Sequence, residues 1–369
     1  MDALDIRGPV AVVGTGLIGG SLGLALRRAR PGISVRGYDP DPEVAAAARE
    51  RGAATEVCDS LEAAVRGAPL TVVAAPVDRI PAVLEAVARV VARDGVVTDV
   101  GSAKEAVVAA GEAALGGAFV GGHPMAGSER HGIGAADASL FEGAAWVLTP
   151  TRATSSRAYS RVSAMGQAVG ATPVAVDAAA HDTLVAALSH LPQLAASALV
   201  DLTASHADRR ALLSLAGPGF RDVTRIAASD PDLWVTIIRA NREAVLGALA
   251  RLGTKVSSLT GIVEAGRWED LRAFLASARR ARAELFAKPG IEAEPVTLSL
   301  LVPDRPGVLA EVTTAAGGLG ANIEDLRIVH SPEGGRGRLE LVVAGERAAE
   351  MLAAELEARG YHPAREALP

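Results

Sequence analysis

The sequence has little of several features that mark whole classes of protein. It holds one cysteine, Cys58, among 369 residues, so no internal disulfide can form and a reducing compartment is indicated. Its net charge of −6 argues against the basic surface that nucleic-acid binding requires. No apolar run reaches the length of a membrane span, and Met1–Pro9 lack the layout of a signal peptide. We therefore expect a cytoplasmic protein that binds neither nucleic acid nor membrane.

Lysine is also rare, since it occurs only at Lys104, Lys255 and Lys288 while arginine supplies the other cations. Because lysine and arginine differ chemically, a position that has lysine in a chain so rich in arginine is of interest. Two interpretations of Lys104 are open: a packed or ion-paired support for the preceding loop, or a plain cation at the start of a helix. No metal site is predicted, and Cys58 is interpreted as a small residue near a strand end.

The chain is long enough for two or three domains. Residues 1–176 alternate short β-branched runs with alanine-rich helical stretches, which is typical of a Rossmann-type parallel sheet with crossover helices. We expect its strands at residues 10–13, 34–38, 70–74, 96–100 and 146–148. The fold class is thus α/β in this first domain.

Two further domains come after it. Residues 177–290 lose the strand signal and repeat leucines at helical spacing, which predicts an all-helical domain with apolar surface for a second subunit, and so a homodimer. After a Pro/Gly-containing linker, residues 296–369 read β-α-β-β-α, a ferredoxin-like α+β module. Its strands are expected at 296–302, 323–329 and 338–343, and its helices at 307–317 and 348–359.

A glycine loop joins the first expected strand to the first helix. In Gly14-x-Gly16-x-x-Gly19, the first glycine permits a tight turn, the second admits a pyrophosphate, and the third lets helix and strand pack closely. The pyrophosphate would lie at the helix N-terminus, where free N–H groups favour an anion. The expected cofactor contacts are Gly14, Gly16, Leu17, Ile18, Gly19, Asp39, Ala75, Pro76 and Ser102.

Asp39 stands at the end of the second expected strand, about 20 residues after Gly19. A carboxylate there accepts hydrogen bonds from the ribose hydroxyls and repels a 2′-phosphate. The sequence therefore favours NAD over NADP, although the nearby Arg36 leaves dual use open.

Three polar clusters come next: residues 99–104 at the end of a strand, residues 122–129, and residues 181–193 in the helical part. Ligands of open α/β sheets bind beyond the carboxyl ends of strands, so the first two clusters are placed for chemistry. His123 precedes Pro124, which favours an extended backbone, and a neutral imidazole there can accept a proton.

At this point the chain resembles the prephenate/arogenate dehydrogenases of tyrosine biosynthesis. The shared strings are D-V-G-S-A-K from Asp99, H-P-M-A-G-S-E from His123, S-H-L-P from Ser189, and G-F-R-D-V-T-R-I-A from Gly219. The C-terminal strings D-R-P-G-V-L and N-I are similar to those of an ACT domain. The resemblance spans residues 10 to 369.

The resemblance implies an NAD-dependent oxidative decarboxylation of prephenate to 4-hydroxyphenylpyruvate. It implies that His123 accepts the hydroxyl proton and that Ser102 hydrogen-bonds the hydroxyl and orients His123 and the nicotinamide. Arg225 is the implied ligand of a substrate carboxylate, where its planar fork can bind bidentately. Arg221, often Lys in the family, would attract the dianionic substrate.

Other residues around the substrate carry over by the same resemblance. His190 is the implied histidine on the cofactor or substrate side, and Glu129 and Asp182 are supporting or gating partners. Gln193 is a departure, because several relatives have a second histidine there. A neutral amide favours prephenate over the ammonium of arogenate but leaves the arogenate alternative open.

The ACT-like module is expected to bind an amino acid where its first loop meets its first helix. Tyrosine, as a feedback inhibitor, is the implied ligand, and a module that only dimerises is the alternative. The expected contacts are Asp304, Pro306, Gly307, Val308 and Asn322.

Two other functions are possible for such a chain. A hydroxyacid-type dehydrogenase predicts a catalytic lysine in the helical domain, but neither Lys255 nor Lys288 lies in such a motif. A non-catalytic amino-acid sensor predicts the loss of Ser102, His123 or Arg225, and all three are present.

Overall fold

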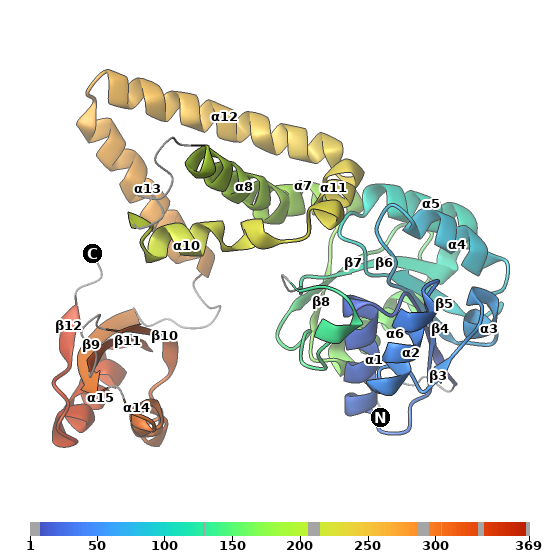
Figure 1. Cartoon of the computed structure of the whole chain (residues 1–369), viewed down its shortest axis with the longest axis horizontal. Helices are drawn as coiled ribbons and strands as arrows, with labels where there is room; N and C mark the ends of the chain where they lie inside the picture. The colour runs from blue at the N-terminus through green and yellow to red at the C-terminus, as the bar shows by residue number, and fades with distance from the viewer. Residues whose placement is uncertain are drawn as a thin grey trace. The chain divides into compact units, whose positions relative to one another are not determined.

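The computed structural model describes residues 8–127, 130–205, 215–286, 295–303, 305–330 and 336–366. The chain forms two compact units, which meet in sequence between Ser258 and Leu259. The first unit holds an eight-stranded sheet and the start of a helical region, and the second holds a four-stranded sheet (Figure 1).

The strands of the large sheet are short and mostly buried. Their order is β3-β2-β1-β4-β5-β6-β7-β8. Their bounds are β1 Val10–Val13, β2 Val35–Tyr38, β3 Glu56–Val57, β4 Leu70–Val73, β5 Val96–Asp99, β6 Phe119–Pro124, β7 Ala145–Thr149 and β8 Thr172–Ala175.

Helices cover both faces of this sheet (Figure 1). One face packs against α1 and α6, and the other against α3, α4 and α5, because the strands are apolar on both sides. The helix bounds are α1 Leu17–Ala29, α2 Pro42–Glu50, α3 Leu61–Val65, α4 Ile80–Ala88, α5 Glu105–Leu115 and α6 Ser156–Ala168, with short 3₁₀ turns η1 Gly116–Ala118 and η2 Ile133–Ala135.

The expected parallel order holds from β3 to β6, but β7 pairs antiparallel with β6, and β8 lies beyond β7. The physical reason lies in the connection. A parallel return needs a crossover of a dozen or more residues, usually helical. The described part of the segment between β6 and β7 contains only η2, so the chain turns back beside the strand it has just left.

Helices dominate the region after β8, as the leucine spacing predicts. A continuous helical run crosses α7 Ala178–Val185, a π-helical turn Ala186–His190 and α8 Leu191–Ala204. The other segments are α10 Pro218–Thr224, η4 Arg225–Ala228, α11 Pro231–Ala240, α12 Arg242–Glu264 and α13 Trp268–Phe286. Within the first unit, Ala186 packs with Val245 and Ala248 of α12 in a small buried cluster.

The run Ala178–Ala204 is long and apolar enough in composition to cross a membrane. Its first half, however, carries His181, Asp182 and His190, which are buried and hydrogen-bonded to other elements of the same unit. A span in lipid would leave such polar groups without these partners, so we interpret the run as a packed protein helix.

The second unit contains an antiparallel sheet of order β10-β11-β9-β12, with α14 and α15 sharing its buried core. The bounds are β9 Pro295–Pro303, α14 Val308–Gly318, β10 Ile323–His330, β11 Arg336–Ala344, α15 Glu346–Ala358 and β12 Ala364–Glu366. The expected ferredoxin-like order is confirmed, and β12 adds a closing strand that the sequence did not predict.

Candidate active site

The glycine loop has the geometry that its spacing predicts. Gly14 has φ +95°, and a Cβ there would lie 2.5 Å from the carbonyl oxygen of Ala74. A Cβ on Gly19 would meet the carbonyl oxygen of Gly14 at 1.9 Å, so only glycine lets α1 approach β1 this closely. Gly16, by contrast, has nothing within 4 Å of its Cβ position, which leaves room above the start of α1.

The N-terminus of α1 is open to an anion. Gly16 caps the helix without a side-chain hydrogen bond, and the first turn contains no acidic residue. Leu17 and Ile18 of that turn are half-buried. The free N–H groups of such a turn bind phosphate oxygens well, so these residues fit a pyrophosphate.

Asp39 lies directly after β2 and is tied to the glycine loop. Its Oδ2 accepts from the backbone N–H of Thr15 at 2.8 Å, and its Oδ1 accepts from Asp41 at 3.1 Å. It borders a hollow of 760 Å³ between α2 and β3, which Arg49 also lines. Arg36 is engaged elsewhere, with Glu56 at 3.2 Å and the carbonyl of Arg66 at 3.0 Å.

The loop after β4 lies beside the glycine loop. Ala75 is half-buried and Pro76 is exposed, and the Cβ position of Gly14 lies 3.1 Å from the backbone nitrogen of Ala75. The carboxyl ends of β1, β2 and β4 therefore meet at one edge of the sheet, where the cofactor contacts were expected.

A buried ion pair supports the next strand ends. The Nζ of Lys104 contacts the carboxylate of Asp99 and donates to the carbonyl of Gly122 at 2.9 Å, and both charged side chains are fully buried. Asp99 also accepts from the backbone N–H groups of Gly101 at 2.7 Å and Gly122 at 3.1 Å. Of the two interpretations of Lys104, the structure selects the ion-paired support.

This pair fixes the two predicted catalytic residues relative to each other. Ser102 comes after Gly101 on the loop between β5 and α5, and His123 comes after Gly122 in β6. Both residues are half-buried. Because Asp99 and Lys104 bind the backbone beside each of them, Ser102 and His123 are carried by one rigid edge of the sheet.

A second network reaches His123 from the helical region. Its Nδ1 lies 2.8 Å from Nε2 of His181, and Nδ1 of His181 lies 2.7 Å from Oδ1 of Asp182. Asp182 also accepts from the backbone N–H groups of Lys104 at 2.7 Å and Glu105 at 2.9 Å, at the start of α5. His181 and Asp182 are only 2% and 4% exposed.

Of the two roles expected for Asp182, these contacts favour the supporting one. The residue is 4% exposed and its carboxylate accepts three hydrogen bonds from protein groups, so the side chain holds the network. Although burial favours its protonated form, the hydrogen bonds from His181 and from the backbone of Glu105 and Lys104 keep the pKa of Asp182 below its ordinary value.

The environment keeps His123 neutral. Burial is the main cause that holds its pKa well below the ordinary 6.5, and the electrostatic effects of Lys104, His181 and His190 act in the same direction. A neutral imidazole is the form that can accept a proton.

The π-helical turn accounts for the shared orientation of the helical residues. At about 100° per residue, His181 and His190 would lie on opposite sides of a regular α-helix. A π turn contains one extra residue, so the part of the helix after it is rotated back by about 100° relative to a regular α-helix. His181, His190 and Gln193 are consequently all buried, at 2%, 1% and 5% exposure.

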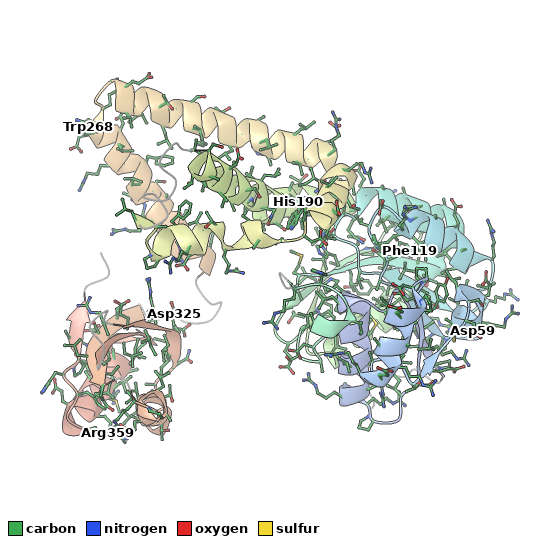
Figure 2. All side chains as sticks on the ribbon, viewed as in Figure 1. Asp59, Phe119, His190, Trp268, Asp325 and Arg359 are labelled. Atoms are coloured by element: carbon green, nitrogen blue, oxygen red, sulfur yellow. The ribbon has the colours of Figure 1, made fainter. Side chains whose placement is uncertain are left out.

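His190 has its own partners. Asn241 donates from Nδ2 to Asp182 O at 2.8 Å, and the same nitrogen lies 3.2 Å from Nδ1 of His190. The ring of Trp234 meets that of His190 edge to face at 6.0 Å. Figure 2 shows His190 on the α7–α8 run, beside α11. Burial is the main cause that lowers the pKa of His190 to about 4, against the opposing effect of Asp182.

The structure does not bring every predicted residue to His123. Arg221 lies on α10 and Arg225 on η4; both are exposed, and their segments pack against α8. Glu129 and Asp304 fall outside the described residues. Lys255 lies on α12, and Lys288 is also outside the described residues.

Three residues of the site were not predicted: His181, Asn241 and Trp234. The string His181-Asp182 was visible in the sequence, but nothing there indicated its distance from His123. One sequence signal could have identified His181 as a site residue. It lies nine residues before His190, a spacing that places both histidines on one side of a helix if the helix contains a π turn.

In the C-terminal unit, the expected ligand residues surround the start of α14. Gly307 caps the helix with φ +94° and no side-chain hydrogen bond, and Val308 is buried. Pro306 and Asn322 are exposed. Arg305 pairs with Glu311 at 3.0 Å, and the hydroxyl of Tyr361 donates to Glu311 at 2.6 Å, which fixes the loop against the helix.

Comparison with known proteins agrees with this arrangement. The sequence model of the prephenate dehydrogenase nucleotide-binding domain matches residues 22–175, and that of the prephenate dehydrogenase dimerization domain matches residues 177–277. The chain belongs to the prephenate dehydrogenase family. Residues 298–359 match the AHAS small subunit-like ACT domain, so the predicted family and its ACT-like module are confirmed.

Individual relatives support the same assignment. A prephenate dehydrogenase of Bacillus subtilis is 32% identical over 91% of this chain and 92% of its own length. A cyclohexadienyl dehydrogenase of Zymomonas mobilis is 32% identical over 65% of this chain and 83% of its own length.

Solved structures confirm the fold class. The prephenate dehydrogenase of A. aeolicus, in complex with hydroxyphenyl propionate and NAD⁺, has a TM-score of 0.71 and 31% identity, covering 76% of this chain and 98% of that one. The arogenate dehydrogenase of Synechocystis has a TM-score of 0.67 and 30% identity, covering 75% of this chain and 99% of that one.

Proposed function

We propose that this chain catalyses the NAD-dependent oxidative decarboxylation of prephenate to 4-hydroxyphenylpyruvate, in the synthesis of L-tyrosine. The observation that carries the proposal is the neutral, network-held imidazole of His123, on the same rigid sheet edge as Ser102. Family membership agrees with this reaction, and the A. aeolicus relative was solved with a hydroxyphenyl acid and NAD⁺.

NAD fits the residues that the glycine loop offers. The open space at Gly16 and the uncapped start of α1 suit the pyrophosphate. Asp39 suits the ribose hydroxyls, and the engagement of Arg36 with Glu56 favours NAD over NADP. Arg49, on the hollow beside Asp39, keeps some use of NADP open.

The chemistry divides between the cofactor and the protein. When bound, NAD accepts the hydride that leaves C4 of the ring as the ring carboxylate departs as carbon dioxide. His123 takes the proton of the C4 hydroxyl and returns it to the phenolate oxygen of the product. Ser102 hydrogen-bonds the same hydroxyl and holds it toward His123. A general base positioned within hydrogen-bond reach of the proton contributes about 10²–10⁴-fold to the rate.

The substrate carboxylates need cationic or donor groups. We assign Arg225 to one carboxylate and Arg221 to electrostatic attraction of the dianion. Glu129 is assigned to support or gating of the site. We assign His190 to the cofactor or substrate side of the site, where an Nδ1 that accepts from Asn241 leaves Nε2–H as a donor.

Gln193 bears on the choice between prephenate and arogenate. A neutral amide lacks the charge that would select the ammonium of arogenate, which favours prephenate. Its Oε1 is nevertheless buried without a hydrogen-bond partner among the described residues. A buried acceptor of this kind is stabilised by a donor on a ligand, so arogenate is the second candidate substrate.

The direct test measures NADH formation with prephenate and with arogenate side by side. We expect faster turnover with prephenate, and we expect the product to be 4-hydroxyphenylpyruvate. Faster turnover with arogenate would assign the enzyme to the second candidate. No NADH with either compound, but activity with a 2- or 3-hydroxyacid, would replace the proposal by the hydroxyacid alternative.

We assign a regulatory role to the ACT-like unit, with tyrosine as its ligand. The uncapped start of α14 at Gly307 and the neighbouring Pro306, Val308 and Asn322 would contact the amino acid, together with Asp304. Tyrosine should inhibit the enzyme and bind to the full chain by calorimetry. If tyrosine binds without inhibiting the enzyme, or neither binds nor inhibits, the alternative that the unit only dimerises would be favoured.

The helical region is assigned to homodimerisation, and its match to the family's dimerization domain supports this. Its helices expose several large apolar side chains, including Leu184, Leu188, Leu246 and Val256. An apolar hollow of 430 Å³ lies between the α7–α8 run and α12. Such surface is commonly covered by a second subunit.

We place the domain boundaries at residues 1–176, 177–290 and 296–369, which the three matched ranges support. The cytoplasm is the proposed location, supported by the single cysteine.

A further inference from the structure

The hydrogen-bond network behind His123 has a direction that can be read from its partners. It runs from the N-terminal turn of α5 through Asp182 and His181 to the imidazole of His123. The catalytic role of this network rests on the proposed function, whereas the tautomer that it imposes on His123 can be measured without any substrate.

The starting point is Asp182, which accepts backbone hydrogen bonds on each oxygen and is ionised at neutral pH. An ionised carboxylate can only accept. The Nδ1 of His181, at 2.7 Å from Oδ1 of Asp182, must therefore carry a hydrogen and donate.

The same reasoning passes to the next ring. A neutral imidazole that donates from Nδ1 has an unprotonated Nε2, which accepts. Nε2 of His181 lies 2.8 Å from Nδ1 of His123, so Nδ1 of His123 donates and its Nε2 is the unprotonated nitrogen.

We propose that His181 is a positioning residue for catalysis: with Asp182 behind it, it holds His123 in the Nδ1–H tautomer and leaves Nε2 to accept the substrate's proton. His181 is 2% exposed and lies behind His123, so it acts through His123. Serine hydrolases use a carboxylate directly on their histidine for the same purpose.

The network also explains how the tautomer is maintained as the enzyme turns over. When Nε2 takes a proton, the positive ring keeps its Nδ1–H bond to His181, whose other nitrogen remains bonded to the carboxylate of Asp182. The backbone donors of Lys104 and Glu105 belong to the start of α5, two and three residues beyond Ser102. The orientation of His123 is thereby coupled to the loop that carries Ser102.

The kinetic test compares three substitutions of His181. His181→Leu removes the acceptor for Nδ1 of His123, and we expect kcat to fall about 10²-fold while KM and NAD affinity change little. His181→Gln can place an amide oxygen at the position of Nε2 and should recover at least part of the loss. His181→Asn is too short to reach His123 and should behave like His181→Leu. His362→Gln, an exposed histidine on the other unit, is the control and should keep wild-type turnover.

The second test reads the tautomer directly. The protein has seven histidines. When they are labelled with ¹⁵N, two-bond ¹H–¹⁵N spectra distinguish rings that are protonated at Nδ1 from rings that are protonated at Nε2. The His123 signal is identified as the one that is lost in the His123→Gln variant. In the wild type this signal should show a ring protonated at Nδ1, and in His181→Leu its protonation pattern should change.

Three outcomes would overturn the proposal: an Nε2–H ring at His123 in the wild type, an unchanged tautomer in His181→Leu, or wild-type kcat in that variant. If the wild type turns over neither prephenate nor arogenate, the proposed function fails while the spectrum still decides the tautomer.

Discussion

Lys104 and Asp182 are 78 residues apart in the sequence, yet the backbone N–H of Lys104 donates to Oδ1 of Asp182 at 2.7 Å. The same lysine binds Asp99 and Gly122 through its side chain. One residue therefore joins the loop of Ser102, the strand of His123 and the first helix of the helical region. Its substitutions should separate structural support from chemistry.

Lys104→Met should destabilise the protein strongly. Loss of the ammonium leaves the carboxylate of Asp99 buried and unpaired, which costs about 3–5 kcal/mol of unfolding free energy. Chemical denaturation measures this change. The matched control is Arg157→Met, which breaks the exposed pair with Asp94 and should cost about 1 kcal/mol or less. Equal effects of the two substitutions would contradict the support role.

His123→Ala should lower kcat by about 10²–10⁴-fold, because the variant lacks the proton acceptor. NAD should bind with nearly unchanged affinity, since the glycine loop and Asp39 are untouched. Stopped-flow turnover and a fluorescence titration of NAD measure the two quantities. Turnover at the wild-type rate would remove His123 from the mechanism.

Asp39→Asn should weaken NAD binding while changing NADP binding much less, or improving it. The amide keeps an oxygen for Thr15 N–H but loses the charge that strengthens the ribose bonds, an effect of about 1.5–3 kcal/mol. The ratio of the two dissociation constants should shift at least tenfold toward NADP. An unchanged ratio would show that Asp39 does not discriminate between the cofactors.

Stability should fall on mild acidification because of His190. Its pKa is about 4 in the folded protein, lowered mainly by burial, against an ordinary 6.5. Between these values the unfolded chain binds a proton that the folded protein does not, so the free energy of unfolding decreases as pH falls and is unaffected above pH 6.5. His123, whose pKa is also lowered, contributes with the same sign.

Urea unfolding at several pH values between 7.5 and 4.5 measures this dependence, and the range lies above the titration of Asp182. His190→Gln should flatten the dependence. A slope identical to that of the wild type would show that His190 is not the group responsible.

Leu188→Glu should disrupt the homodimer, because Leu188 is 70% exposed on the helical run and a charge there would be buried against a second subunit. Sedimentation equilibrium should report a monomer, or a dimer weakened by orders of magnitude. Val174→Glu, at an exposed apolar position on β8, is the control and should not change the association. A fully dimeric Leu188→Glu variant would place the interface elsewhere.

Much of the fold was predictable because its signals are local. The apolar runs of β1, β2, β4 and β5 and the helical spacing after residue 177 were identified to within a residue or two. β6 was missed because Gly121 and Gly122 weaken its strand pattern. The structure explains those glycines: a Cβ at Gly121 would lie 2.3 Å from Thr149 Oγ1, and one at Gly122 would lie 2.6 Å from Asp99 O.

The sequence by itself determined the glycine loop and the family, and it supplied Asp39, Ser102 and His123 as candidates for the site, because each lies in a short local motif. Only the tertiary structure decided that Lys104 is buried against Asp99, that Asp182 binds the start of α5 and His181, and that His181 stands behind His123. These contacts join residues of separate elements, up to 78 positions apart, and a π turn sets the rotation that brings the histidines to one side. Neither the separation nor the rotation is encoded in any local pattern, so folding alone brings these groups together.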